Sequence, residues 1–398
     1  MRRLCTGLGS KFSRPSPRSN VRTSARDSMV AGVFLFTLFA GSQGYGAVTA
    51  VSVQSPALAT DGTVSVTSPV HFEATAESTL KITGYVVYVD GENVFQNFVP
   101  LLDAWVVLGS GTHTAYIKAW DSSGALLSTP TYDIDVTGFA PPTPPVSGAH
   151  IMHIDEVSWR VDNSPDVGGQ CNDGSIGSFQ SATDPNTENS PDFGGTGQLF
   201  IVTSKCQYDD ALFIRSDNKS PSPYARDTNF LWDFWFYIPA STQAGSFQAL
   251  ESDLYQAVQM SDGVHEFMFG SQCNYATNQW QFWLPQNGKL TWVNGGYSPC
   301  QFTTGSWHHA TYFLQRVTVS GYQEIPASFT SSTDTNTDLR FGTLTIDGNT
   351  IYLGGLSNST IPQNPKWSPT LGVQHQLDSA KSGVTIEEYM DNESLTTW

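Results

Sequence analysis

The chain has 398 residues, of which 39% are hydrophobic, 12% are aromatic and only 14% are charged. This composition excludes a disordered chain, because the aromatic residues are numerous enough to fill real cores. Seven of the 19 basic residues but only one of the 36 acidic residues lie in positions 1–50, so the remainder carries a net charge of about −23. A surface this acidic repels phosphate backbones and anionic lipid headgroups, so we expect no nucleic acid and no membrane-surface partner.

Residues 1–50 have the pattern of an export signal peptide. A basic stretch leads into an apolar run at 29–41, and small residues follow. The run is too short to span a bilayer comfortably. We predict cleavage after Ala50, with a cut near Gly46 and an uncleaved signal anchor as the alternatives. The protein is therefore expected to be secreted or on the cell surface, with no membrane association beyond export.

The cysteines that follow the signal agree with export. An even number in an exported chain predicts two disulfides. Asn287-Gly288 is a hairpin turn signal between Trp-rich strand candidates, and one cysteine lies 14 residues before it and another 12 residues after it. This near-symmetry predicts a disulfide between these two, and the other two cysteines then pair with each other. A zinc site is the alternative, but no CxxC spacing supports it. The predicted pairs are Cys273–Cys300 and Cys171–Cys206.

Residues 51–137 contain short runs of alternating polarity, separated by turn signals such as Asp61-Gly62 and Asp90-Gly91. This pattern predicts a β-sandwich of about 85 residues. The stretches at 88–91, 111–114 and 119–124 resemble bacterial immunoglobulin-like domains, in which they build turns and core. A Pro-rich segment at 138–148 then predicts an extended linker. The expected strands are 63–67, 70–74, 84–89, 104–108, 114–120 and 132–136.

Residues 149–398 form a second expected domain, again without a convincing amphipathic helix. Many of its strand candidates are apolar on both faces, which is typical of stacked sheets. Nine of the 11 tryptophans lie in this part, so most of them are expected in its core. The expected strands are 197–202, 230–238, 246–255, 266–270, 280–283, 289–293, 308–316, 344–353 and 371–377.

The order of these segments resembles the concanavalin A-like lectins and glucanases. The residues that carry the resemblance are at 232–237, 250–254, 305–309, 344–348 and 387–391. The resemblance implies a jelly roll of two stacked curved sheets, whose concave face holds a glycan. The predicted fold class is therefore all-β, with an immunoglobulin-like sandwich followed by a concanavalin A-like jelly roll.

Glu251 and Asp253 are two residues apart on an expected strand, so their side chains share one face. In the family-16 glucanases that resemble this domain, the matching strand carries a nucleophilic Glu, an Asp and a final acid/base Glu. This sequence has Tyr255 or Gln256 where the acid/base belongs. An amide cannot protonate a leaving oxygen, and a phenol is a weak acid at neutral pH. A role in binding sugar hydroxyls or calcium, or a purely structural role, is the alternative to catalysis.

A lyase would need a base and a group that neutralises a uronate carboxylate. His309 and Tyr255 are candidate bases, and Arg316 and Gln374 are candidate neutralising groups; Gln376 shares a strand face with Gln374. Jelly-roll alginate lyases carry an R-x-E-x-R strand and a Q-[IV]-H strand, and only the second has an echo here, at 373–375. His308 and His309 are adjacent, so at most one of them can reach a shared site.

Trp280, Trp283 and Trp292 surround the expected hairpin and are candidates for stacking on sugar rings, although each alone is more typical of the core. Calcium is the one cofactor that the sequence leaves open, through Asx-rich loops at 184–189 and 334–338. We therefore interpret the chain as a secreted, lectin-like protein that binds a poly- or oligosaccharide. An extracellular polysaccharide lyase or glycoside hydrolase is the first alternative, and a structural or adhesive surface protein is the second.

Overall fold

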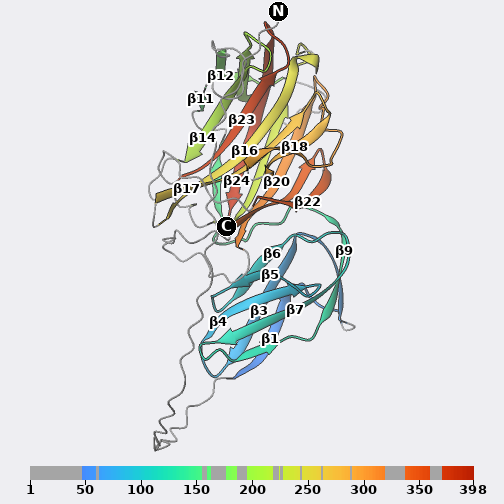
Figure 1. The fold of residues 1–398 in the computed structure, drawn as a ribbon, viewed down its shortest axis with the longest axis vertical. Helices are drawn as coiled ribbons and strands as arrows, with labels where there is room; N and C mark the ends of the chain where they lie inside the picture. The colour runs from blue at the N-terminus through green and yellow to red at the C-terminus, as the bar shows by residue number, and fades with distance from the viewer. Residues whose placement is uncertain are drawn as a thin grey trace, which may run out of the picture. The chain divides into compact units, whose positions relative to one another are not determined.

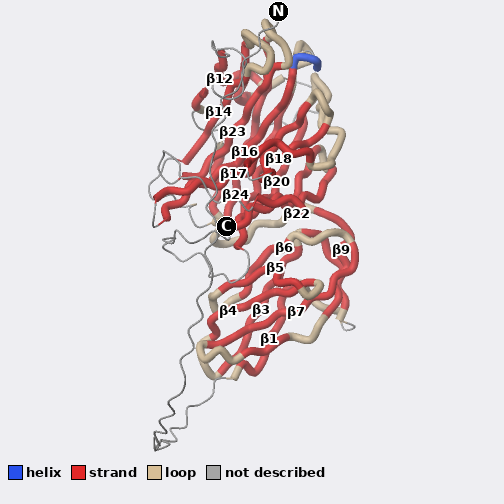
Figure 2. The backbone as a smooth tube through the Cα atoms, viewed as in Figure 1, coloured by secondary structure: helices blue, strands red, loops and turns tan. Residues whose placement is uncertain are grey.

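The computed structural model describes residues 47–398 apart from eleven short gaps. Within the described residues the regular secondary structure is all β-strand, apart from one 3-10 turn at Ala244–Ser246 (Figure 2). None of the described helices has the length and hydrophobicity required to cross a bilayer. The gaps are 60–61, 155–158, 163–175, 186–194, 218–223, 225–226, 243, 261–262, 287–288, 319–336 and 359–369.

The first part of the described chain is a sandwich of two sheets (Figure 1). The alternation of buried and less buried residues along β3 explains why it forms a sheet with one inner face, since Val70, Phe72 and Ala74 are buried there. The first sheet has the order β1 (Val48–Ser55), β3 (Val70–Ser78), β6 (Leu102–Val106). The second has the order β2 (Thr63–Ser68), β9 (Tyr132–Phe139), β7 (Gly111–Asp121), β4 (Ile82–Val89), β5 (Glu92–Asn97), with β8 (Leu126–Ser128) paired to β7.

The start of this sandwich bears on the expected signal boundary. β1 begins at Val48, whose side chain is buried in the core, and it pairs with β3. The expected cut after Ala50 falls inside this strand, whereas the alternative cut near Gly46 leaves the strand whole. Residues 1–46 lie outside the described residues.

The remaining strands form a larger sandwich of an eight-stranded and a seven-stranded sheet. The eight-stranded sheet has the order β12 (Ile176–Thr183), β13 (Thr196–Thr203), β24 (Thr385–Thr397), β15 (Asn229–Tyr237), β20 (Trp307–Thr318), β21 (Thr337–Ile346), β22 (Asn349–Asn358), with β10 (His150–His153) paired to β24. The seven-stranded sheet has the order β11 (Arg160–Asp162), β14 (Asp210–Asp217), β23 (Thr370–Ser379), β16 (Phe247–Met260), β17 (Gly263–Asn274), β18 (Gln279–Gln286), β19 (Lys289–Asn294).

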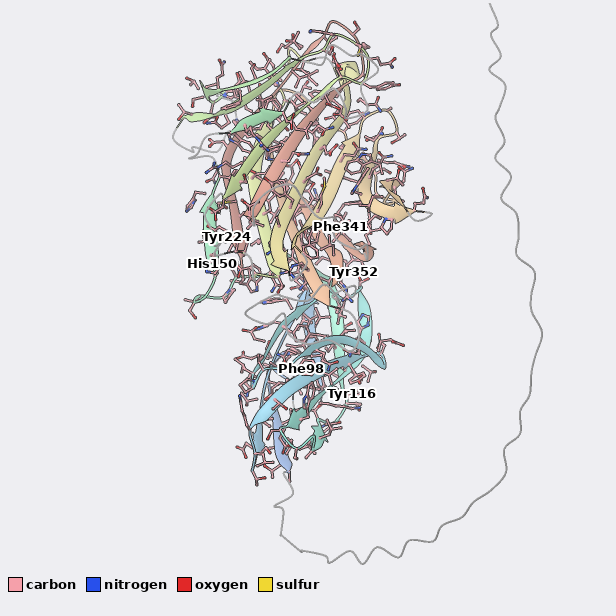
Figure 3. All side chains as sticks on the ribbon, turned by 60° about the vertical axis from the view of Figure 1, so that its left-hand side comes forward. Phe98, Tyr116, His150, Tyr224, Phe341 and Tyr352 are labelled. Atoms are coloured by element: carbon pink, nitrogen blue, oxygen red, sulfur yellow. A yellow bond between two sulfur atoms is a disulfide. The ribbon has the colours of Figure 1, made fainter. Side chains whose placement is uncertain are left out.

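Aromatic side chains fill the space between these two sheets. Trp232, Phe269 and Phe341 are among the largest fully buried side chains, and Phe341 is labelled in Figure 3. The fold class is thus confirmed as all-β, and both parts are sandwiches. One expected strand, 344–353, is instead the hairpin of β21 and β22, because Asp347 and Gly348 have positive φ angles of 50° and 78° and make the turn between them.

The disulfide Cys273–Cys300 is present, with a Cα–Cα distance of 5.5 Å, as the spacing around the expected hairpin predicted. β18 and β19 pair on either side of that turn, whose residues 287–288 lie outside the described residues. Cys206 is also disulfide-bonded. Its predicted partner, Cys171, lies outside the described residues.

Candidate functional site

The outer face of the seven-stranded sheet carries most of the polar residues that the sequence singled out. Along β16, Leu250 and Leu254 belong to the core, so the alternate residues Glu251, Asp253 and Tyr255 lie on the opposite face. β23 and β17 flank β16 and continue the same face (Figure 1). The alternation therefore gathers side chains from several strands on one surface.

Four carboxyl groups lie on this outer face. Glu251 and Asp253 come from β16, Asp378 comes from β23, and Asp210 on β14 is paired in register with Asp378. All four side chains are largely buried, and Gln376 Nε2 donates a hydrogen bond to Asp378 Oδ1 (2.8 Å). We call these four residues the carboxyl group cluster.

The cluster holds protons more tightly than ordinary carboxyls do. Burial raises the pKa of Asp210 to about 8, with further contributions from the nearby charges of Asp378, Asp209 and Asp162. Burial raises the pKa of Asp378 and of Asp253 to about 7. Burial, followed by the charges of Asp253 and Asp378, raises the pKa of Glu251 well above its ordinary value. Neighbouring buried carboxyls cannot all ionise, so protons are shared among them at neutral pH.

A row of amides continues across the sheet from the cluster. Gln272 Nε2 donates to Gln281 Oε1 (2.6 Å), and Gln281 Nε2 donates to Asn294 Oδ1 (2.8 Å). These residues are cross-strand partners on β17, β18 and β19, and Gln272 is the partner of Glu251. On the other side of the cluster, Gln374 Nε2 donates to Asp253 Oδ2 (3.1 Å). We call Gln272, Gln281 and Asn294 the amide row.

Two indoles stand beside the amide row. Trp283 and Trp292 are register partners on β18 and β19, half-buried, and their rings meet edge to face at 5.1 Å. Gly270 makes room for them, since a Cβ at this position would lie 2.7 Å from Trp283 Cβ and 3.3 Å from Trp292. The same Cβ would lie 3.2 Å from Asp253 Oδ1, so both indoles and one member of the carboxyl group cluster lie around Gly270.

The structure brings together seven of the predicted site residues on this one face. They come from β16, β18, β19 and β23, which the sequence placed far apart. They are Glu251, Asp253, Tyr255, Trp283, Trp292, Gln374 and Gln376.

Three other predicted residues lie elsewhere. Trp280 is the register partner of Cys273 and is buried in the core. It is three residues from Trp283 on the same strand, so the two indoles point to opposite faces of the sheet. Arg316 is 1% exposed between the sheets, where its Nε donates to Gln256 Oε1 (2.7 Å). His309 lies on β20, in the other sheet. Of the candidate groups for a lyase, His309 and Arg316 therefore lie away from this face, while Tyr255 and Gln374 lie on it.

Asp210 and the amide row are not among the residues that the sequence singled out, whereas Asp378 was expected to share a strand face with Gln374 and Gln376. Asp210 was missed because β14 was not recognised as a strand. The amides carried a usable signal, since Gln272 and Asn274 flank Cys273 and Gln279 and Gln281 flank Trp280, although only Gln281 falls within an expected strand. Alternation along the chain does not determine the register in which β17, β18 and β19 pair, and this register is what places the three amides side by side.

Metal ligation finds no support among the residues that the structure describes. No group of three or more His, Cys, Asp or Glu side chains there has an arrangement that could hold a metal ion. The two Asx-rich loops considered for calcium, 184–189 and 334–338, lie mostly outside the described residues.

Comparison with known proteins yields structural likeness alone. No protein-family model matches the chain, and no curated protein matches it. Similar solved structures include promiscuous carbohydrate-binding modules of the β-sandwich superfamily, with 14% identity, a TM-score of 0.25 and coverage of 87% of this chain and 96% of that chain.

Two further structures belong to other classes of protein. Peanut lectin has 9% identity and a TM-score of 0.28, covering 61% of this chain and 97% of its own. A carbohydrate esterase from the Shiga toxin-encoding bacteriophage phi24B has 11% identity and a TM-score of 0.30, covering 56% of this chain and 90% of its own. At such scores the likeness carries no argument about function. The chain resembles β-sandwich proteins, among them carbohydrate-binding and lectin domains.

Proposed function

We propose that the protein binds a carbohydrate on the outer face of its seven-stranded sheet. The observation that carries this proposal is the amide row beside Trp283 and Trp292. An amide side chain both donates and accepts hydrogen bonds, which suits sugar hydroxyls that do the same. Indoles offer an apolar surface with a polar N–H, which suits the C–H face of a pyranose ring.

The carboxyl group cluster narrows the class of glycan. Buried carboxyls that already repel one another disfavour a ligand that adds negative charge. We therefore propose a neutral poly- or oligosaccharide rather than a uronate polymer. A lyase that acts on acidic polysaccharide is not proposed, since His309 and Arg316 lie away from this face.

A glycoside hydrolase on the same face is the second candidate. Glu251 and Asp253 are hydrogen-bonded neighbours, and burial raises the pKa of both carboxyls. A general acid must hold its proton near neutral pH, and a raised pKa permits this. Gln256, one of the two residues in the acid/base position of the related glucanases, faces the interior and donates to Tyr224 O (2.7 Å). Binding without hydrolysis therefore remains the first proposal.

The rest of the chain is proposed to serve this binding. The first sandwich would act as an immunoglobulin-like spacer, and the second as a concanavalin A-like module. Export through the basic and apolar segment at 1–50 would place both outside the cell. A disulfide such as Cys273–Cys300 is typical of that oxidising environment.

The test is binding of the purified chain to neutral oligosaccharides (gluco-, manno-, xylo- and galacto-) and to oligouronates, by calorimetry, together with an assay of released reducing ends. We expect binding to at least one neutral oligosaccharide and none to oligouronates. Gln281→Ala breaks the amide row and Trp283→Ala removes one indole, and each should weaken binding at least tenfold. One hydrogen bond or one stacking contact accounts for about 1–2 kcal/mol.

The matched control is Gln180→Ala, because Gln180 is an exposed glutamine on β12 of the other sheet. It should bind as the wild type does. New reducing ends that disappear in Glu251→Gln would replace the lectin proposal with the hydrolase. No binding to any oligosaccharide would favour a structural or adhesive protein.

A further inference from the structure

A second cluster of aromatic and polar residues lies on the outer face of the eight-stranded sheet. Along β15, Trp232, Phe234 and Phe236 belong to the core, so Asp233 and Trp235 alternate onto the opposite face. Trp235 is the register partner of His309 on β20. Their rings stack at 4.5 Å with planes only 9° apart.

Hydrogen bonds hold His309 in one orientation. Its Nε2 lies 3.0 and 2.9 Å from the two carboxylate oxygens of Asp233, and Thr311 Oγ1 donates to the same carboxylate (2.6 Å). A carboxylate accepts hydrogen bonds, so Nε2 carries the hydrogen. In the neutral ring Nδ1 is then an acceptor. The histidine thus presents a fixed acceptor next to an indole.

A second histidine–aspartate pair forms the neighbouring wall. His308 Nδ1 lies 2.8 Å from Asp347 Oδ2, and the backbone N–H of His309 donates to Asp347 Oδ1 (2.9 Å). The side chain of Asp347 remains 44% exposed, so its oxygens can accept further hydrogen bonds. His308 and His309 each bond to their own aspartate, and both line the same hollow, so the expectation that at most one of them could reach a shared site is wrong.

Trp235, His308, His309 and Asp347 line a hollow of about 510 Å³. Small-molecule sites are commonly of this size, with aromatic walls and a few placed polar groups. Trp307 and Ser306 also line the hollow. The carboxylate of Asp347 lines the hollow and that of Asp233 is hydrogen-bonded to His309, which disfavours an anion. Hydrogen-bond acceptors beside indole walls suit a neutral ligand with hydroxyl groups and an apolar face.

We propose that this hollow is a second saccharide-binding site, which takes a single neutral pyranose ring. The ring packs against the Trp235–His309 stack, and its hydroxyls bond to His309 Nδ1 and to the carboxylate of Asp347. The site is independent of the amide row, because the two occupy different sheets. The protein therefore has two binding sites for sugar on one molecule.

The test uses the whole purified chain with methyl glucoside, methyl galactoside and methyl mannoside, followed by saturation-transfer NMR titration. We expect transfer to at least one glycoside in the wild type. It should persist in Trp283→Ala/Trp292→Ala, which removes the indoles of the first site. His309→Phe keeps an aromatic ring against Trp235 but removes Nδ1, and it should weaken binding at least tenfold, as should Trp235→Leu. Tenfold corresponds to about 1.4 kcal/mol.

The matched control is His153→Gln, because His153 is an exposed histidine on β10; it should leave binding unchanged. The proposal is overturned if no glycoside binds to the wild type, or if binding survives both His309→Phe and Trp235→Leu. It is also overturned if Trp283→Ala/Trp292→Ala abolishes all transfer. Failure of the first site instead appears as oligosaccharide binding that does not respond to Gln281→Ala, so the two failures are distinguishable.

Discussion

At the residue scale, the candidate site depends on the absence of a side chain at Gly270. Its neighbours across the strands are Asp253 on β16 and Trp283 on β18, and each approaches the glycine closely. A close approach of this kind is one of the reasons for a glycine inside a strand. Gly270 thereby lets an indole and a carboxyl share the same small area of the sheet.

Gly270→Ala should therefore damage both folding and binding. The added Cβ would be 2.7 Å from Trp283 Cβ. The position of a Cβ is fixed by the backbone, so rotation of the Trp283 side chain cannot relieve this contact. Overpacking of this kind lowers the free energy of unfolding by about 1–3 kcal/mol. Urea denaturation measures this change. Gly245→Ala is the control, since a Cβ there would meet only the flexible end of Lys381 at 3.2 Å; equal stability of both variants and the wild type would contradict the argument.

Asp210 makes stability depend on pH. Its pKa is about 8 in the folded protein, because of burial and then the charges of Asp378, Asp209 and Asp162, while an ordinary aspartate has 3.8. Between these values the unfolded chain has released a proton that the folded chain keeps. Stability contributed by this group is thus present below pH 4 and is lost as the pH rises through 8.

Asp210→Asn should remove this loss. As the pH rises from 5 to 8, the free energy of unfolding of the wild type should fall relative to that of the variant by on the order of 2 kcal/mol. This figure is reduced for partial exposure of the side chain. Guanidinium denaturation at the two pH values measures the difference. A wild type and a variant with the same pH dependence would show that Asp210 titrates normally.

At the scale of the elements, a buried ion pair connects the two sheets of the larger sandwich. His375 on β23 and Glu393 on β24 lie 3.0 Å apart, and both side chains are almost fully buried. Trp232 on β15 donates to the same glutamate oxygen (2.8 Å). Burial opposes protonation of His375, but the charge and hydrogen bond of Glu393, with the charges of Glu388 and Asp253, together outweigh it and raise the pKa of the histidine.

Glu393→Gln should therefore destabilise the protein most strongly at acidic pH. A raised histidine pKa contributes stability that is fully present below the ordinary value and is lost as the pH rises through the folded value. Without Glu393, the buried imidazolium loses its hydrogen-bonded counter-ion and keeps only the weaker influence of Glu388 and Asp253. Breaking a buried pair in this way costs about 3–5 kcal/mol. Denaturation at pH 5.5 and pH 8.5 measures the free energy of unfolding. A loss that is as large at pH 8.5 as at pH 5.5 would contradict the role of His375.

At the scale of the whole molecule, the described residues form two hydrophobic cores that share no residue. One is built from strands β1–β9 and the other from strands of the larger sandwich. A core of its own is what allows a domain to fold alone. Each sandwich is closed by pairs within its own strands, as the sheet orders state.

Residues 47–139 should therefore fold without the rest of the chain. We expect a single cooperative unfolding transition with a stability on the order of 5 kcal/mol, the lower end for small domains. Circular dichroism during heating measures it. A matched fragment that begins at residue 51, after the expected cut, should be less stable because it loses Val48 from the core. A disordered 47–139 fragment would show that the sandwich depends on the second core.

The sequence by itself determined the fold class, most of the strands, the Cys273–Cys300 pair and the shared face of Glu251 and Asp253. Period-two alternation and turn residues are local properties, so they can be read along the chain. Only the tertiary structure decided which strands are neighbours. Strand order and register place Asp210, Asp378 and the amide row beside the residues of β16, whereas His309 lies in the other sheet. Both arise from packing of residues far apart in sequence, because a shift of one residue would turn each side chain to the opposite face.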